Sequence, residues 1–405
     1  MMRSLFSGVS GLLTHQTRMD VIGNNIANVN TVGFKASRVT FKDMLYETMR
    51  AATAPMGTRG GTNPQQVGLG VQLGSIDVLH TPGNLQPTGV TTDLAIRGNG
   101  LFVLLDGEQQ YYTRAGVFDF DSEGWLVSKT SGLKVAGWVA DKDGKLDPTG
   151  PLVPIQIPAD HSLPAQPTTE VVLQGNLDAS VETGTTFQRT VTVYDSLGRR
   201  HDVIVNFVKE GDNIWQWQAY RNSNSTGYGG YIRFTDTGEF STATATEVRF
   251  NPGGGAAQVV FNIDFSRLTQ YSSETELSVR SQNGFPPGAL EEIRIDASGI
   301  ITGIFSNGLT QTLAQVAVAT FANPGGLEQA GETLFRASHN SGLPRTGPPG
   351  TGDRGVIAPG NVEMSNVDLS EEFTSMIITQ RGFQANSRII TTSDEMLQEL
   401  VNLKR

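Results

Sequence analysis

Residues that could bind a metal are present in this sequence, but their spacing does not favour a metal site. The stretch DFDSEG, residues 119–124, begins like a calcium-binding loop, yet its twelfth position is Thr130, which lacks the required carboxylate. We therefore expect DFDSEG to form a hairpin turn. The histidines form neither an HExxH motif nor a close pair with metal-ligand spacing; they are His15, His80, His161, His201 and His339.

Motifs for nucleophilic catalysis and phosphate binding are incomplete as well. Ser131–Lys134 spells S-x-x-K, but the companion SDN and KTG motifs are missing. The glycine-rich GLGVQLG, residues 68–74, lacks the lysine of a phosphate-binding loop. We expect no catalytic residue, no cofactor and no enzyme. A surface enzyme or sugar-binding module in the middle of the chain is the least favoured alternative.

The most unusual polar stretch is DVIGNNIANVNTVGFK, residues 20–35, where asparagines interrupt a helical apolar pattern. Asparagine is a poor helix former because its amide competes for nearby backbone groups. One interpretation is a helix end, with Gly33 stopping the helix and Asn28 or Asn30 in a left-handed conformation. The other is a surface that donates and accepts hydrogen bonds to another molecule.

Composition narrows the class of protein. The chain has 405 residues, 47 of them glycine, a net charge of −10 and no cysteine. Nothing resembles a basic stripe, so we expect no nucleic-acid partner. No apolar run approaches the roughly 20 residues that span a bilayer, so we expect no membrane insertion. The N-terminus lacks the pattern of a cleaved secretory signal, so export would need another route.

Both ends of the chain have heptad spacing of apolar residues. At the C-terminal end Met376, Phe383, Ile390 and Leu397 repeat every seven residues, and Ser365 or Asp368 could cap this helix. These two apolar stripes, one on each predicted helix, predict that the terminal helices pair as a coiled coil. Two ordinary core helices of a globular domain would fit the same pattern. The N-terminal seam alternates four- and three-residue steps through Leu5, Val9, Leu12, Gln16, Met19, Gly23 and Ile26.

Between the helices, short β-branched and aromatic runs alternate with glycine-containing turns. The predicted fold is mainly β with α-helical termini, in which a split β domain contains an inserted second β domain. We assign residues 1–45 and 361–405 to a terminal helical domain and 46–75 to an extended arm. We assign 76–160 and 286–360 to the split β domain and 161–285 to the inserted outer β domain. The turn sequences DSEG, 121–124, and DASG, 296–299, support one domain split by an insertion.

Three segments resemble the bacterial flagellar axial proteins, which form rod, hook and hook-associated structures. GNNIANVNTVGFK, 23–35, is similar to the N-terminal signature of that family. TTDLAIRGNGLFVLL and YYTRAGVFDFDSEGWLV, at 91–105 and 111–127, are similar to its first β-domain signature. The segment from Glu363 to Leu403 is similar to its C-terminal signature. The clear resemblance covers about half of the chain.

The resemblance implies a subunit of a tubular helical polymer whose terminal helices line a central channel. The inserted domain, with VYDSLGRRHDVIVNF at 193–207, favours a curved hook that acts as a universal joint over the alternative, a rigid distal rod. Implied partners are further copies of itself and the rod, hook-cap and hook–filament junction proteins. Asparagines in such a tube can hydrogen-bond across subunits. The expected self-assembly residues are Leu5, Val9, Leu12, Met19, Asn24, Asn25, Ile26, Asn28, Met376, Phe383, Ile390 and Leu397.

The resemblance also implies export by the flagellar type III apparatus to the hook or basal body, outside the cell and without a cleaved signal. Early substrates of that system resemble one another in an F-x-x-x-hydrophobic motif, which Phe41 to Leu45, FKDML, matches. The alternative is that Phe41 packs in an ordinary helix.

Overall fold

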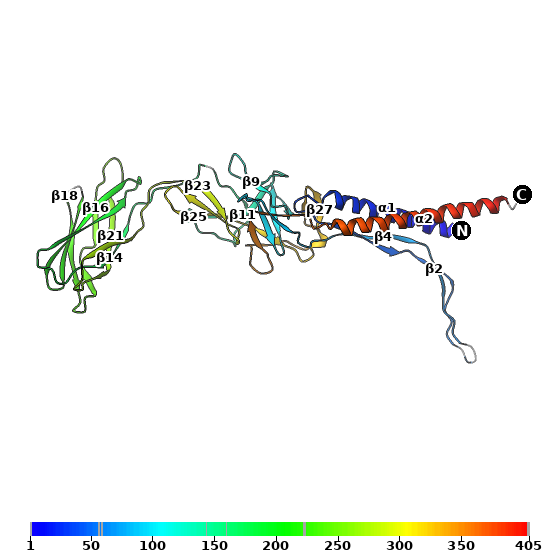
Figure 1. Cartoon of the computed structure of the whole chain (residues 1–405), viewed down its shortest axis with the longest axis horizontal. Coiled ribbons are helices and arrows are strands. Elements are labelled where there is room, and N and C mark those ends of the chain that lie inside the picture. Colours follow the sequence, from blue (N-terminus) through cyan, green and yellow to red (C-terminus); the bar gives the residue numbers. More distant parts are fainter. Residues whose placement is uncertain are drawn as a thin grey trace. The chain divides into compact units, whose positions relative to one another are not determined.

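A computed structural model describes residues 2–55, 57, 60–142, 144–158, 160–221 and 224–402 (Figure 1). The chain divides into two compact units. The first contains Met1–Pro158, Arg294–Thr302 and Thr312–Arg405, and the second contains Ala159–Ile293 and Gly303–Gln311. The division falls within three strands, β23 (Gly288–Ile295), β24 (Ile300–Phe305) and β25 (Thr310–Val316).

The first unit has a helix near each end of the described chain. Helix α1 spans Met2–Ala27 and helix α2 spans Leu369–Asn402, and they pack against each other (Figure 1). The predicted fold class, mainly β with paired terminal helices, is therefore confirmed. Asp368 is the residue that caps α2, because its Oδ1 accepts hydrogen bonds from the backbone N–H groups of Ser370 at 2.8 Å and Glu371 at 3.3 Å.

The segment after α1 corrects two expectations. The helix ends at Ala27, so residues 28–45 are not helical, and Gly33 does not form its cap. Gly33 has φ +70°, whereas Asn28 and Asn30 do not adopt a left-handed conformation. A Cβ at Gly33 would lie 2.4 Å from the backbone nitrogen of Ala115, so a close approach to the β structure requires glycine here.

The expected arm is a β-hairpin rather than an extended linker. Strand β1 (Ser37–Asp43) pairs with β4 (Val71–Val78), and β2 (Tyr46–Arg50) pairs with β3 (Gln65–Gly68). Every residue of β2 and β3 is exposed. A strand alternates apolar and polar residues when one of its faces is buried. Neither face of this two-stranded ribbon is buried, so its sequence lacks that alternation and did not indicate the strands.

The remaining strands of the first unit build antiparallel β structure. Strand β5 (Leu85–Pro87) pairs with β31 (Asn361–Glu363), and β6 (Leu94–Arg97) pairs with β30 (Val356–Pro359), which ties both ends of this β structure together. The predicted hairpin turn is confirmed: β9 (Phe118–Phe120) pairs with β10 (Leu126–Ser128), and Asp121 Oδ1 accepts hydrogen bonds from the backbone N–H groups of Glu123 and Trp125. The other elements are β7 (Leu101–Asp106), β8 (Gln109–Thr113), β9 (Phe118–Phe120), β10 (Leu126–Ser128), β11 (Lys134–Val139), β12 (Val153–Pro154), β26 (Val318–Thr320), the 3-10 helix η1 (Pro324–Gly326), β27 (Glu328–Gly331), β28 (Leu334–Arg336) and β29 (Arg345–Gly347).

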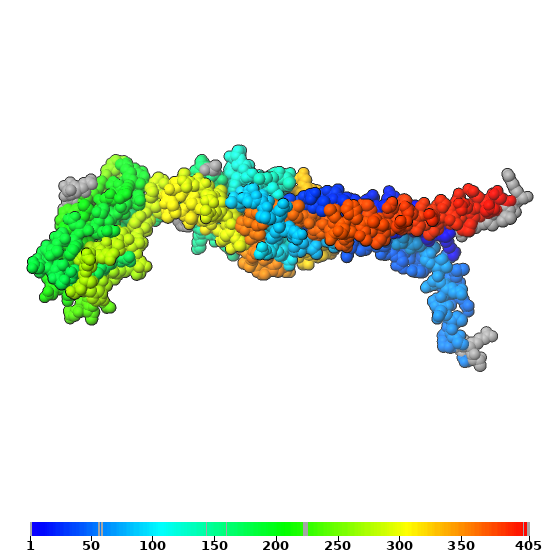
Figure 2. Space-filling view, viewed as in Figure 1, coloured from blue at the N-terminus to red at the C-terminus, as the bar shows by residue number. Residues whose placement is uncertain are grey.

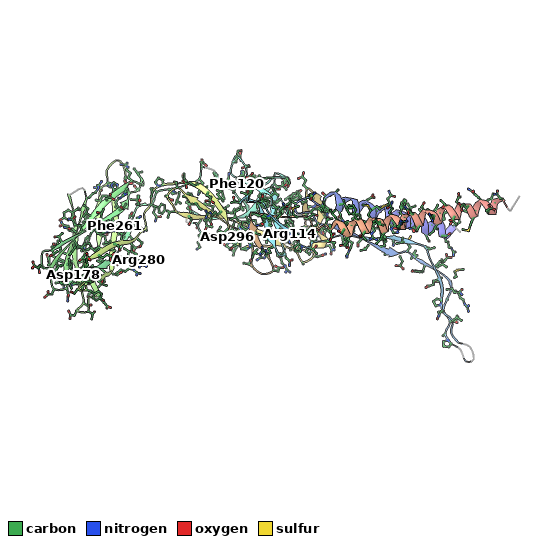
Figure 3. All side chains as sticks on the ribbon, viewed as in Figure 1. Arg114, Phe120, Asp178, Phe261, Arg280 and Asp296 are labelled. Carbon is green, nitrogen blue, oxygen red and sulfur yellow. The ribbon has the colours of Figure 1, made fainter. Side chains whose placement is uncertain are left out.

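The second unit contains two sheets that share one core. Trp217 and Phe207 of the first sheet contact Phe265 of the second, with ring centroids 5.2 and 6.2 Å apart, and Phe261 is buried with them (Figure 3). The five-stranded sheet comprises β15 (Thr186–Tyr194), β16 (Arg200–Gly211), β17 (Ile214–Arg221), β18 (Asn224–Phe234) and β19 (Phe240–Ala243). The four-stranded sheet comprises β20 (Glu247–Phe250), β21 (Val259–Thr269), β14 (Glu170–Asn176) and β22 (Glu276–Gln282), and β13 (Ser162–Leu163) pairs with β23.

Candidate assembly surface

The contact between α1 and α2 is made by small and polar residues. A Cβ at Gly11 would lie 2.6 Å from Nδ2 of Asn386, and one at Gly8 would lie 3.3 Å from Cγ1 of Ile390. On the other helix, a Cβ at Gly382 would lie 2.7 Å from the ring of His15. Glycine lets the two backbones approach closely, so that side chains of one helix, such as Ile390, pack directly against the backbone of the other.

Of the predicted heptad residues, Ile390 packs against Gly8 in this seam, whereas those of α1 lie beside its buried stripe. On α1, Leu5, Leu12, Met19 and Ile26 are half-buried and Val9 is exposed, whereas Gly8, Gly11, Thr14, Ile22 and Asn25 are buried. At about 100° per residue, the predicted stripe lies roughly a quarter turn or more away from the buried one. On α2 the predicted residues are half-buried: Met376, Phe383, Ile390 and Leu397.

Large apolar side chains instead point away from the seam. On α1, Phe6 is 64% exposed and Leu13 is 58% exposed; together with Met2 and Val9 they follow helical spacing on the face opposite Gly8 and Gly11. The outward apolar residues of α2 are Leu369, Phe373, Ile377, Ile378, Met396 and Val401. In Figure 2 the orange-to-red atoms of α2 run alongside the blue atoms of α1. We call these residues of both helices the outward stripes.

The asparagines of the opening motif have different environments. Asn25 is 1% exposed, its Nδ2 donates to the backbone oxygen of Ser37 and to Oε1 of Glu372, and its Oδ1 accepts the N–H of Ser37. Its hydrogen-bonding groups are thus used within the chain, where they join α1, β1 and α2, and we remove it from the expected assembly residues. Asn28 donates to Asn24, and Asn24 is exposed.

A buried ion cluster joins the segments that adjoin the helices. Lys35 Nζ lies 2.5 Å from Oε1 of Glu363, and Arg114 Nη1 lies 3.4 Å from Oε2 of the same carboxylate (Arg114 is labelled in Figure 3). The side chains of Lys35 and Glu363 are fully buried. Burial lowers the pKa of Lys35 and of Arg114, while the Glu363 carboxylate opposes that shift.

Sequence reasoning missed this cluster, although Lys35 and Glu363 both lie inside the family signatures. Periodicity identifies apolar faces and gives no sign that a charged residue is buried. The partners are also 328 positions apart in the chain. A basic residue directly after Phe34 and an acidic residue between Val362 and Met364 were the available signals.

His80 faces the same cluster from the start of the β structure. Its Nε2 is buried and has no hydrogen-bond partner in the described part of the chain. Burial, and then the positive charges of Lys35 and Arg114, lower the pKa of His80 from 6.5 to about 4. His80 is therefore neutral in the folded protein at neutral pH.

The stability of the first unit should fall as the pH drops from about 6.5 to about 4. In that window the unfolded chain binds a proton at His80 that the folded protein does not bind, so the free energy of unfolding rises with pH. Urea unfolding at a series of pH values measures this slope. We expect a shallower slope for His80→Gln, and the wild-type slope for the exposed control His339→Gln. Equal slopes in all three proteins would contradict the assignment.

The proposed export motif begins in strand β1 and ends in the connection to β2, so it is not helical. Phe41 is in β1, its ring packs edge-on against His15 at 5.6 Å, and the guanidinium of Arg18 lies 5.9 Å from its centroid. The alternative that Phe41 packs in an ordinary helix is therefore wrong, although Phe41 does pack against α1. Leu45 is 77% exposed.

Other kinds of site have little support in the described ranges. No group of three or more His, Asp or Glu side chains there is placed to hold a metal ion. Asp121, the third residue of the calcium-like stretch, uses one carboxylate oxygen for its own turn. No helix among the described residues is both long and apolar enough to cross a membrane.

Comparison with known families matches most of the chain. Residues 5–35 match the flagella basal body rod protein family, and residues 358–403 match the flagellar basal body rod FlgEFG protein C-terminal family. Residues 95–175 match the flagellar hook protein FlgE/F/G D1 domain, and 156–285 match the flagellar basal body protein FlaE D2 domain. The chain is 39% identical to the flagellar hook protein FlgE of Treponema pallidum, with complete coverage of both chains. The chain belongs to the flagellar hook protein FlgE family.

Other relatives support this membership. The FlgE of Borreliella burgdorferi is 40% identical over the whole of both chains. The flagellar basal-body rod protein FlgG of Bacillus subtilis is 34% identical, also over the whole of both chains. The crystal structure of the hook protein FlgE2 of Helicobacter pylori has the same fold, with a TM-score of 0.54 and 15% identity over 69% of this chain and 99% of that chain.

Proposed function

We propose that this FlgE-family chain is the structural subunit of a flagellar hook, and that it polymerises into a curved tube which transmits torque as a flexible joint. The outward stripes support this proposal most directly. Two paired helices that leave residues such as Phe6 and Ile377 exposed need a further apolar surface to cover them. Equivalent helices of neighbouring copies supply that surface in a tube.

The domain assignment made from sequence becomes part of the proposal. Residues 1–45 and 361–405 would line the channel, 46–75 would form an arm, 76–160 with 286–360 the middle layer, and 161–285 the outer layer. The assembly residues are the predicted Leu5, Val9, Leu12, Met19, Asn24, Ile26, Asn28, Met376, Phe383, Ile390 and Leu397, extended by the outward stripes. Rod, hook-cap and hook–filament junction proteins are the expected partners at the ends of the tube.

A second candidate is a straight distal-rod subunit. The specific observation in its favour is the full-length similarity to a basal-body rod protein FlgG. Electron cryomicroscopy of the native polymer distinguishes the two functions. A curved tube outside the cell, with the terminal helices at its inner wall, supports a hook, while a straight rod within the envelope supports the second candidate. A protein that stays monomeric in the cell would contradict both.

We also propose export through the flagellar type III apparatus, with Phe41 and Leu45 in the recognised motif. Phe41→Ala should strongly reduce the amount of protein secreted, because recognition of the unfolded chain depends on that side chain. Immunoblots of culture medium and cells measure the ratio. Phe102→Ala removes a fully buried phenylalanine outside the motif and is the matched control for lost stability. Normal secretion of the Phe41→Ala protein would refute this role.

A further inference from the structure

A cavity of about 230 Å³ lies between the segment that follows α1 and the hairpin formed by β27 and β28, close to the C-terminal end of α1 in Figure 1. Its lining includes the apolar residues Phe34, Leu334 and Phe335, and Glu332 at the turn of the hairpin. Cavities of about 150 Å³ admit a benzene molecule, so this one has room for an aliphatic side chain. We call it the hairpin pocket.

Glu332 gives the hairpin pocket a carboxylate without a counter-charge. Lys35 also lines the pocket, but its ammonium group is paired with Glu363. Arg336 of the same hairpin lies 2.8 Å from Glu328. The exposed carboxylate of Glu332 has no hydrogen bond or ion pair in the part of the chain that the structure describes. The hairpin pocket therefore suits an apolar side chain that is accompanied by a cation.

The turn that carries Glu332 has a backbone conformation that its residues rarely adopt. Glu332 has φ +50° and Thr333 has φ +59°. Two-residue hairpin turns with positive φ at both positions favour Asn-Gly, and a β-branched residue such as threonine fits them poorly. The hydroxyl of Thr113 donates to the backbone oxygen of Thr333 at 3.0 Å and so helps to hold the turn. Backbone strain of this kind concentrates at binding sites, which supports a role in binding for this turn.

A second feature of the first unit has the complementary properties. Leu343 is 87% exposed, more than any other large apolar side chain in the described ranges. Two residues later, Arg345 of β29 is also exposed, and its guanidinium has no hydrogen bond or ion pair within those ranges. Asp353 bonds instead to the hydroxyl of Thr320, the residue paired with Arg345. An exposed apolar side chain is thus followed closely by an unpaired cation.

The loop that carries Leu343 is fixed by hydrogen bonds. Ser341 is fully buried, and its Oγ donates to the backbone oxygen of Ser338 at 2.9 Å and accepts the N–H of Ser338 at 3.0 Å. Nδ2 of Asn323 donates to the backbone oxygen of Asn340 at 3.0 Å. Leu343 is therefore presented on an ordered loop before any partner binds, which lowers the entropic cost of binding.

We propose that Leu343 of one copy inserts into the hairpin pocket of a neighbouring copy, where Arg345 of the first copy pairs with Glu332 of the second. The occupant is a second copy because one chain carries both the apolar side chain with its cation and the pocket with its carboxylate. The contact joins two different surfaces, so it continues from copy to copy and does not close on two. This inference rests on the proposed function, since it needs a polymer, and it adds a contact made by the β structure to those made by the outward stripes.

Disulfide trapping tests this contact, because the chain has no native cysteine. Thr31 lines the hairpin pocket and is half-buried. Polymers of a Leu343→Cys, Thr31→Cys protein should give a ladder of linked subunits on mild oxidation. Each single variant supplies a thiol on only one of the two surfaces, so its polymers should give no ladder. A link that forms within one chain in place of the ladder would show that the loop reaches its own pocket, and would overturn the proposal.

A charge exchange provides a second measurement that does not depend on cysteine geometry. Arg345→Glu and Glu332→Lys should each raise the critical concentration for polymerisation about tenfold, and the double variant should assemble within about threefold of wild type. Both side chains are exposed in the single chain, so urea unfolding of each monomer should be unchanged.

The two measurements separate this contact from the proposed function. Wild-type polymers in which neither the ladder nor the restoration is observed would overturn the contact between Leu343 and the hairpin pocket, and would leave the hook function intact. Failure of the wild-type protein to polymerise would instead overturn the proposed function, and this contact with it.

Discussion

The substitution Phe6→Glu is expected to abolish polymerisation at concentrations where the wild-type protein assembles. Phe6 lies on the outward stripe of α1, opposite the seam with α2, and is 64% exposed in the single chain. Burying one large apolar side chain contributes about 1.5–3 kcal/mol. Losing that contribution at each subunit contact raises the critical concentration at least roughly tenfold, and a carboxylate placed in an apolar contact adds a desolvation cost.

Sedimentation across a concentration series measures this critical concentration, and electron microscopy of the pellet shows whether tubes are present. Phe6→Leu is the matched control, since it keeps most of the apolar surface at the same position and should assemble within a few-fold of wild type. Circular dichroism of both variants should show unchanged β structure. Assembly of Phe6→Glu at the wild-type concentration would mean that this stripe is not an assembly surface.

The terminal helices show how far sequence periodicity can be taken. A repeat of apolar residues every seven positions correctly predicted that the first and last segments are helices and that they pack together. It could not identify which helix face makes this contact. In a subunit of an assembly, some apolar residues pack inside the chain and others pack against neighbouring chains. Here Gly8, Gly11 and Gly382 make the internal contact. Large apolar residues outside the predicted heptads, such as Phe6 and Ile377, remain exposed for the external one.

The residues from 28 to 45 could not be predicted in the same way. Their strand β1 pairs with β4, which begins 34 positions after β1, and neither strand has a fully buried residue. Local sequence records propensity and burial, and long-range pairing of strands without a fully buried face leaves little trace in either. The sequence indicated that Gly33 has a structural role. Glycine is needed there because the backbone of Ala115 lies too close for a side chain, and not because a helix ends there.

The buried polar groups explain why the ends of the chain are tied to the β structure as well as to each other. Asn25 reaches Ser37 and Glu372, and Asn366 reaches Leu79 and Thr81. Each contact joins a segment next to one helix with a segment near the other. A helix pair with a glycine-rich seam is thereby fixed at its base, while the outward stripes stay available to other copies.

The substitution Glu363→Gln should lower the free energy of unfolding of the first unit by about 3–5 kcal/mol. The amide matches the carboxylate in size but leaves the buried charges of Lys35 and Arg114 without their counter-charge, which is the costly way to break a buried ion pair. Urea unfolding in a Trp215→Phe, Trp217→Phe background isolates the signal of the first unit, since Trp125 and Trp138 then remain as its fluorophores.

The pH dependence of this loss identifies its cause. Burial already lowers the pKa of Lys35, and removing the Glu363 charge lowers it further, so the folded variant favours a neutral lysine while the unfolded chain stays protonated up to about pH 10. The unfolded state then binds more protons, and the stability deficit should shrink as the pH rises. The double variant Lys35→Met, Glu363→Gln should recover part of the lost stability, because it removes one of the unpaired buried charges. Asp77→Asn is the control: it breaks the exposed pair between Arg38 and Asp77 and should change the free energy of unfolding by less than about 1 kcal/mol. A deficit that is independent of pH and unaffected by Lys35→Met would show that the cost arises from packing at Glu363 and not from unpaired buried charge.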